Sequence, residues 1–163
     1  MSDMVLRYLT EDRILLNMTA RNKAEGLREL AALVENSAEI PDFRKFLSAV
    51  FQKESRFGSG VGEGVALPHY RDEKVKEPVI CLGVSEKGIE WGETEWGEKE
   101  QVNILILVAW PYTHADNYLK TVAEIARLLR MATVREKILG AETASDVRAA
   151  LQMNGSGKAR LAC

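Results

Sequence analysis

The spacing of apolar residues changes several times along the chain, and each change marks a predicted element. Residues 13–18, RILLNM, form a short apolar run without helical spacing, which predicts a strand. Helical spacing follows, and a second helix is predicted to open at Pro41, because proline fits a first helical turn. The apolar faces of these two helices carry Leu27, Leu30, Ala31 and Val34, and then Phe43, Phe46, Leu47, Val50 and Phe51.

The middle of the chain has the pattern of a buried sheet. Residues 65–67 form a short apolar strand, and the runs 78–84 and 102–108 are rich in Val and Ile, as expected for strands buried on both faces. The polar, glycine-containing segment 88–98 between them predicts an excursion over the surface.

Three helices are predicted in the C-terminal third. Asp116 or Asn117 is expected to cap the first, which has apolar residues from Leu119 to Leu129. Thr133 and Glu136 have the spacing of a capping box for the second, and residues 143–151 form the third.

The order is therefore strand, two helices, three strands and three helices. This order predicts an α/β protein of three layers, α/β/α, with a mixed sheet. The length of 163 residues suits one domain, assigned to residues 1–153, and the polar segment 154–163 is expected to be a flexible tail.

Charge and cysteine content exclude several classes of protein. The 22 basic and 24 acidic residues give a net charge of −2 without a basic block, so nucleic-acid binding is not expected. No segment approaches 18 uncharged apolar residues, so membrane insertion is not expected either. Cys81 lies in an apolar run and is interpreted as a buried thiol, and Cys163 is the last residue. Two such cysteines favour a reducing cytoplasm, and neither a metal nor a cofactor is expected. Trp91, Trp96 and Trp110 fit either a core or a partner surface.

His69 is the residue most suggestive of chemistry. It follows an apolar strand and Pro68, so a rigid backbone would hold one ring nitrogen while the other acts as a nucleophile. A histidine that merely closes a strand is the alternative. Just before it, GSGVGEG places four glycines among residues 58–64, and glycine amides can form an anion site. Gly60, Gly62 and Gly64 are therefore predicted to cradle a phosphoryl group.

The segment GVGEGVALPH resembles the signature around the phosphorylated histidine of the fructose/mannitol-type EIIA proteins, which include the nitrogen-regulatory branch, of the bacterial phosphoenolpyruvate-dependent phosphotransferase system. LTEDRILLNM, KGIEW, VNILILVAWP and LKTVAEIARLLR extend the similarity over residues 5–151. The resemblance implies that His69 accepts a phosphoryl group from HPr or its nitrogen-branch counterpart. The group would then pass to an EIIB cysteine or act as a signal to regulatory target proteins.

The resemblance also implies a set of charged groups around His69. Lys53 occupies the usual place of an arginine, and Arg56, three residues later, is a second candidate for the positive charge. Tyr118 replaces a second family histidine, and His114 is near enough in sequence to take its place. Tyr70 stands where the family has a small residue. These departures support an alternative, a regulatory interaction module that kept the fold and lost phosphotransfer.

Overall fold

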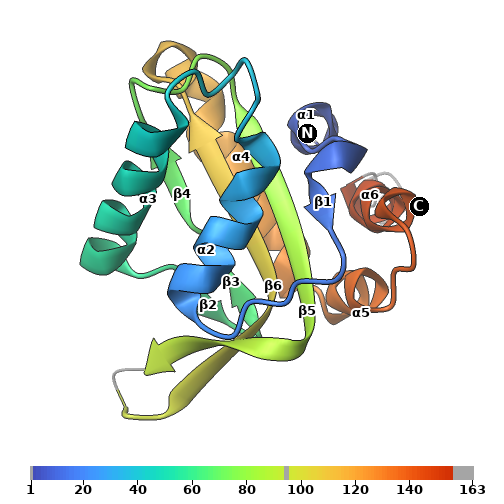
Figure 1. The fold of residues 1–163 in the computed structure, drawn as a ribbon. Helices are drawn as coiled ribbons and strands as arrows, with labels where there is room; N and C mark the ends of the chain where they lie inside the picture. The colour runs from blue at the N-terminus through green and yellow to red at the C-terminus, as the bar shows by residue number, and fades with distance from the viewer. Residues whose placement is uncertain (1, 94–95, 156–163) are drawn as a thin grey trace.

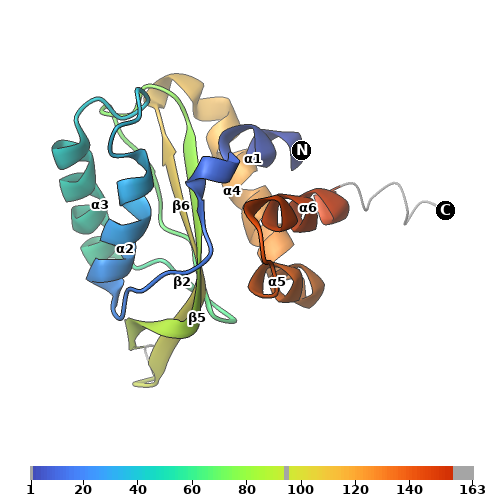
Figure 2. The same ribbon diagram turned by 45° about the vertical axis from the view of Figure 1, so that its right-hand side comes forward.

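A six-stranded mixed sheet lies between two layers of helices in the computed structural model, which describes residues 2–93 and 96–155 (Figures 1 and 2). The strands run across the sheet in the order β1 (Ile14–Leu15), β5 (Val79–Glu93), β6 (Lys99–Trp110), β3 (Val65–Ala66) and β2 (Gly60–Gly62), and β4 (His69–Arg71) also pairs with β6. The β5–β6 and β2–β3 pairs are antiparallel, and the other pairs are parallel. The sheet is mixed, as predicted.

The helices divide between the two faces of the sheet (Figure 2). One face carries α2 (Lys23–Ala31) and α3 (Phe43–Phe57), and the other carries α1 (Ser2–Tyr8), α4 (Ala115–Arg130), α5 (Ala132–Leu139) and α6 (Ala144–Gly155). Short 3-10 helices occupy Glu11–Arg13 (η1), Ala32–Val34 (η2) and Tyr112–His114 (η3). The predicted three-layer α/β/α architecture is confirmed.

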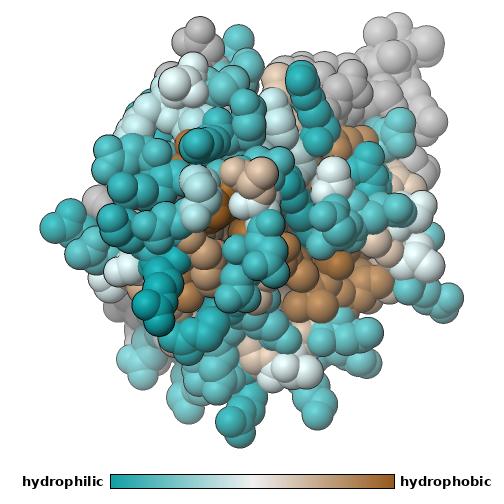
Figure 3. Space-filling view, turned by 45° about the horizontal axis from the view of Figure 1, so that its top comes forward, coloured by the Kyte–Doolittle hydropathy of each residue, from teal (hydrophilic) through white to brown (hydrophobic). Residues whose placement is uncertain are grey.

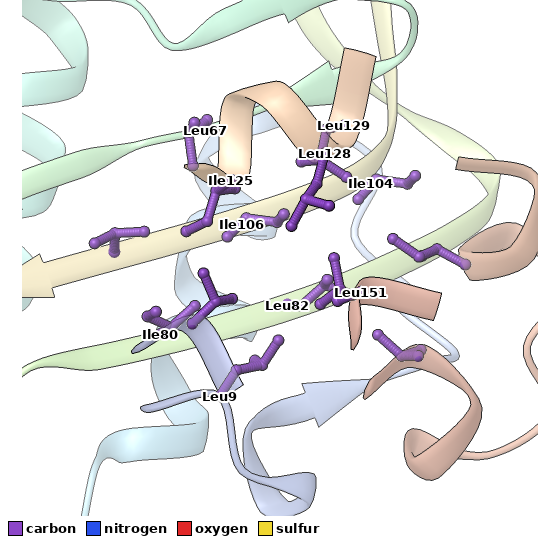
Figure 4. Packing of buried hydrophobic residues seen from close by; sticks show 14 of the residues in the cluster. Leu9, Leu67, Ile80, Leu82, Ile104, Ile106, Ile125, Leu128, Leu129 and Leu151 are labelled. Carbon is purple, nitrogen blue, oxygen red and sulfur yellow. The ribbon is translucent and has the colours of Figure 1, made fainter. Parts of the chain in front are cut away.

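Each face of the sheet has its own buried apolar cluster. Along β5, Ile80 and Leu82 belong to the cluster under α1 and α4, whereas Val79 and Cys81 belong to the cluster under α2 and α3. This alternation follows from the strand period of two residues. Figure 4 shows the first cluster, in which residues of α4 meet the β6 side chains, among them Ile125 and Ile106.

The structure adds one α-helix, two strands and the three 3-10 helices to the predicted order, and it shortens one strand. Helix α1 and strands β2 and β4 were not predicted, and β1 covers two residues of the predicted strand 13–18. The surface excursion expected at 88–98 is wrong for its first half, because β5 continues to Glu93. There Ile89 and Trp91 are buried and Glu90 is exposed, so this half has the alternation of a half-buried strand. Trp96, beyond it, is 82% exposed.

Helix starts also differ from the sequence predictions. Neither Asp116 nor Asn117 caps α4: its N-cap is His114, because the 3-10 turn η3 leads directly into the helix. Thr133 lies inside α5, whose N-cap is Met131, so the predicted capping box is wrong. Helix α3 starts after Pro41, and the Asp42 side chain caps it by accepting the Lys45 N–H.

Helix α6 includes the first two residues of the predicted tail 154–163, and the remainder of that tail, with Cys163, lies outside the described residues.

Within the described part, every helix is too short or too polar to cross a membrane. Trp91 and Trp110 are core residues. Hydrophilic side chains dominate the face seen in Figure 3, and apolar ones gather near its middle.

Candidate active site at His69

His69 begins the short edge strand β4, and its environment determines which ring nitrogen is reactive. Pro68 precedes it, and the Pro68 carbonyl accepts the Val108 N–H of β6 at 2.9 Å, so the backbone is anchored to the sheet. The Nδ1 atom of His69 lies 2.7 Å from the Leu67 carbonyl oxygen. Because a carbonyl only accepts, Nδ1 carries the proton in this contact, and in the neutral imidazole Nε2 then keeps its lone pair. The His69 side chain is exposed, so Nε2 is suited to act as a nucleophile.

The imidazole borders a pocket of about 340 Å³. Helix α3 contributes Lys53 and Glu54 to its lining, strand β4 contributes Arg71, and helix α4 contributes Tyr118. The parallel pairing of β4 with β6 brings these segments together, because His69 lies beside Val108 and Arg71 lies beside Trp110. The pocket therefore depends on three elements that are distant in the sequence.

A buried carboxylate lies on the α3 side of this pocket. Glu54 is 4% exposed, and its carboxylate accepts hydrogen bonds from the Ser59 hydroxyl at 2.8 Å and the Tyr70 hydroxyl at 3.2 Å. The Lys23 ammonium, 3.2 Å from the same carboxylate, neutralises it. Burial first, and then the negative charge of Glu54, raise the pKa of Tyr70. The large residue that follows His69 thus serves to connect β4 to α3.

Two cations approach strand β4 differently. The Lys53 ammonium donates a hydrogen bond to the Arg71 carbonyl oxygen at 2.5 Å, lies 3.9 Å from the Asp72 carboxylate and covers the Tyr70 ring. The Arg71 guanidinium lies over the Tyr118 ring, with its Cζ atom 5.3 Å from the ring centre, and 5.8 Å from the centre of the Tyr112 ring.

Tyr118, which stands in the sequence where the family resemblance assigns a second histidine, lies beside His69. Its ring centre is 6.2 Å from that of His69 and 6.1 Å from that of Trp110. Burial raises the pKa of Tyr118, and the Arg71 charge offsets this in part. Tyr118 is therefore a neutral neighbour of His69 at physiological pH.

Two of the predicted site residues lie elsewhere. Arg56 is exposed in the last turn of α3, and the His114 Nε2 atom is 3.9 Å from the Glu77 carboxylate, with its Nδ1 atom 3.0 Å from the Thr113 hydroxyl. Among the described residues that line the His69 pocket, Arg56 and His114 are both absent. His114 therefore does not take the place of the missing family histidine.

The glycines of the predicted phosphoryl cradle lie in the hairpin formed by β2 and β3. Gly60 and Gly62 belong to β2, and the turn from β2 to β3 has positive φ angles at both Glu63 (56°) and Gly64 (74°). This combination is typical of tight hairpin turns. In the described part of the chain, Gly58 is the pocket-lining glycine, and Gly60, Gly62 and Gly64 lie outside the pocket. The positive φ angles of Gly62 and Gly64 favour glycine at these two positions of the hairpin.

Sequence reasoning missed Arg71 and Glu54. Arg71 lies two residues after His69, so both side chains share one face of a strand, but residues 69–71 were not predicted to be a strand. Glu54 belongs to the predicted α3 helix, and only the packing of that helix on β4 shows that its carboxylate is buried. The described residues hold no cluster of three or more histidine, cysteine or acidic side chains that suits a metal ion.

Comparison with known proteins identifies the family. Residues 7–154 match the family model "Phosphoenolpyruvate-dependent sugar phosphotransferase system, EIIA 2". The chain belongs to this EIIA family. The match includes strand β4 with His69 and all the pocket-lining residues named above.

Similar proteins include both sugar-specific and regulatory members. The chain is 24% identical over 139 residues to the fructose-specific EIIABC component of Bacillus subtilis; the match covers 85% of this chain and spans 21% of that protein. The crystal structure of the nitrogen regulatory protein IIA-Ntr from Neisseria meningitidis superposes with a TM-score of 0.80, at 22% identity, over 91% of this chain and 99% of that one.

A third neighbour is an EIIA protein in a complex. It is enzyme IIA of mannitol from Escherichia coli, solved with phosphorylated enzyme IIB, with a TM-score of 0.74 and 17% identity over 89% of this chain and 97% of that one. At these identities the two solved structures establish the EIIA fold of this chain.

Proposed function

We propose that this EIIA protein is a phosphoryl carrier in which the Nε2 atom of His69 takes a phosphoryl group from HPr or a nitrogen-branch counterpart. The observation that carries the proposal is the Nδ1 contact with the Leu67 carbonyl at 2.7 Å, at the border of an open pocket. It presents Nε2 with its lone pair on an edge strand, where a partner protein can reach it. Membership of the EIIA family supports the same role.

The transfer needs an aligned nucleophile and stabilised charge. The Nε2 lone pair attacks phosphorus, and the bond between phosphorus and the donor protein breaks with its electron pair leaving on the donor. The imidazole ring becomes positively charged and keeps its Nδ1 proton, which the Leu67 carbonyl stabilises. Passing the group on reverses these steps, with the acceptor as nucleophile.

The proposed site contains His69 as the phosphorylated residue and Lys53 as a cation at the pocket edge. Arg56, His114, Gly60, Gly62 and Gly64, which the sequence suggested for the site, are left out of it. Among the described residues, none of these five lines the His69 pocket.

Two destinations for the phosphoryl group are compatible with the site. One is the cysteine of an EIIB protein or domain, and the mannitol enzyme IIA that shares this fold was solved with phosphorylated enzyme IIB. The other is a regulatory target, as the name of the Neisseria neighbour suggests for that protein. We propose that the chain acts through one of these partners in the cytoplasm.

Phosphorylation of the whole chain tests the proposal. The protein is incubated with phosphoenolpyruvate, Enzyme I and HPr, and its intact mass is recorded before and after acid treatment, because phosphohistidine is labile to acid. We expect the mass of one phosphoryl group on the wild type and none on His69→Ala. The chain has two histidines, so His114→Ala is the matched control and should be phosphorylated like the wild type.

An unmodified wild type, or a His69→Ala protein that still gains acid-labile phosphate, contradicts the proposal. The first result favours the alternative function, an interaction module with the EIIA fold. Tyr118 is the observation behind that alternative, because it fills the place beside His69 with a neutral ring. Adding an EIIB protein to the phosphorylated chain then separates the two destinations: loss of phosphate from His69 to the EIIB cysteine indicates sugar transport.

A further inference from the structure

We infer that Arg71 binds the phosphoryl group on His69, and that Lys53 holds the backbone which presents Arg71. This inference rests on the proposed phosphorylation of His69 and names the group that stabilises its charge. Both side chains line the His69 pocket, so the assignment depends on the direction from which each approaches the imidazole.

Strand geometry places Arg71 beside His69. Both residues belong to β4, two positions apart, so their side chains leave the same face of the strand. The burial pattern agrees, because His69 and Arg71 are exposed and the intervening Tyr70 is buried in the cluster under α2 and α3. A guanidinium at this position can reach a group that projects from the imidazole.

Tyr118 links the two side chains. Its ring centre lies 6.2 Å from the His69 ring centre and 5.3 Å from the Arg71 Cζ atom. A second ring, Tyr112, lies 5.8 Å from the same Cζ atom. Two aromatic contacts restrict the long arginine side chain to the pocket and leave its N–H groups for a ligand.

Lys53 approaches the strand from the other face. It extends from α3, packs over the ring of the buried Tyr70 and donates to the Arg71 carbonyl oxygen at 2.5 Å. The Asp72 carboxylate, 3.9 Å from the ammonium, also lies there. The Lys53 ammonium is therefore committed to the backbone and a carboxylate, and it acts as a positioning group for β4.

The chemistry of the phosphoryl group agrees with this division. Charge spreads over the oxygens of the transferring group, and the planar guanidinium donates two parallel N–H bonds to such oxygens, whereas an ammonium acts as a point charge. The sequence lacks an arginine at the position that the family resemblance assigns to the active-site cation. Arg71 supplies that guanidinium from β4.

The test compares rates of phosphorylation by phosphorylated HPr. We expect Arg71→Gln to lower the rate on the order of 100-fold, as for loss of one well-placed donor to developing charge. Arg71→Lys should recover only part of this loss. Arg44→Gln is the matched control, since it removes one exposed arginine from α3 outside the pocket, and it should leave the rate unchanged. Melting temperatures of all variants check that they fold.

A second arm replaces HPr with phosphoramidate, a small phosphoryl donor, and follows the phosphohistidine by intact mass. Slower loading of Arg71→Gln is expected here too. If phosphoramidate phosphorylates the wild type and HPr does not, the proposed function is contradicted. The phosphoramidate rates of the wild type and Arg71→Gln then still test the role of Arg71. The inference is overturned if Arg71→Gln is phosphorylated at the wild-type rate, or if Lys53→Gln is phosphorylated more slowly while Arg71→Gln is not. It is also overturned if neither donor phosphorylates the wild type.

Discussion

At the scale of single residues, Tyr70 connects strand β4 to helix α3. Its hydroxyl donates to the buried Glu54 carboxylate at 3.2 Å, and its ring lies under the Lys53 ammonium, 5.5 Å from it. The same carboxylate accepts a hydrogen bond from the Ser59 hydroxyl and forms an ion pair with Lys23. The residue next to the proposed nucleophile is therefore part of the support of the site.

Replacing Tyr70 tests this support. Tyr70→Phe removes a donor to a buried carboxylate and should lower the free energy of unfolding at pH 7 by about 1–3 kcal/mol. Urea unfolding measures the change. Tyr112→Phe, which keeps its ring and alters an exposed side chain, is the control and should be close to the wild type.

The pKa shift of Tyr70 predicts a further effect of pH. Burial raises this pKa above its ordinary value of 10.0, so the folded protein keeps the proton that the unfolded chain releases. The contribution of protonated Tyr70 to the free energy of unfolding is fully present below pH 10.0 and is lost as the pH rises above this value. Wild-type stability should therefore fall more steeply between pH 9 and pH 11 than that of Tyr70→Phe. Parallel slopes for the two proteins would contradict this account.

At the scale of elements, the β2–β3 hairpin has the glycines that the sequence suggested for a phosphoryl site. Gly62 and Gly64 have φ angles of 87° and 74°. A Cβ at Gly64 would also lie 3.1 Å from the Asn103 side-chain oxygen, whereas a Cβ at Gly62 would meet open space. The strained backbone alone makes alanine unfavourable at both positions.

Alanine at these glycines should therefore lower stability without changing the rate of phosphorylation. We expect Gly62→Ala and Gly64→Ala to lower the free energy of unfolding by about 1–2 kcal/mol, because of strain, with the larger loss at Gly64. Phosphorylation of the folded variants should proceed at the wild-type rate. Melting temperatures and HPr-dependent rates, measured on the same samples, provide the comparison. A normal melting temperature with a much slower transfer would restore the glycine loop to the site.

At the scale of the whole molecule, the two ends of the described chain are joined. Arg148 of α6 donates to the carbonyl oxygen of Leu6 at 2.8 Å and also to that of Leu9. Helix α1 meanwhile buries Val5 in the same apolar cluster as Val147 and Leu151 of α6. Figure 1 shows the two helices side by side, far from each other in sequence.

This junction should stabilise the whole fold. Arg148→Met leaves two partly buried carbonyls without their charged donor and should lower the free energy of unfolding by about 1–3 kcal/mol. Because Arg148 is not among the residues that line the His69 pocket, phosphorylation of the folded protein should be unaffected. Arg130→Met, an exposed arginine at the end of α4, is the control. Equal urea midpoints for the two variants would show that the junction contributes little.

The sequence alone determined the layers and pointed to His69 as the proposed nucleophile. The change from helical to strand spacing predicted the α/β/α architecture, since burial of apolar faces depends on local periodicity. His69 was identified because Pro68 and a preceding apolar strand are adjacent in sequence. Cys81 was assigned to the core for the same local reason, and it is fully buried.

Only the tertiary structure decided which side chains meet His69. Arg71 became a neighbour once the pairing of β4 with β6 defined a strand at residues 69–71, and the packing of α3 directed Lys53 to the backbone of that strand. His114 ends the 3-10 turn η3, and its imidazole lies beside the Glu77 carboxylate. These contacts depend on strand register and helix packing between segments distant in sequence, which local patterns of residue type do not encode.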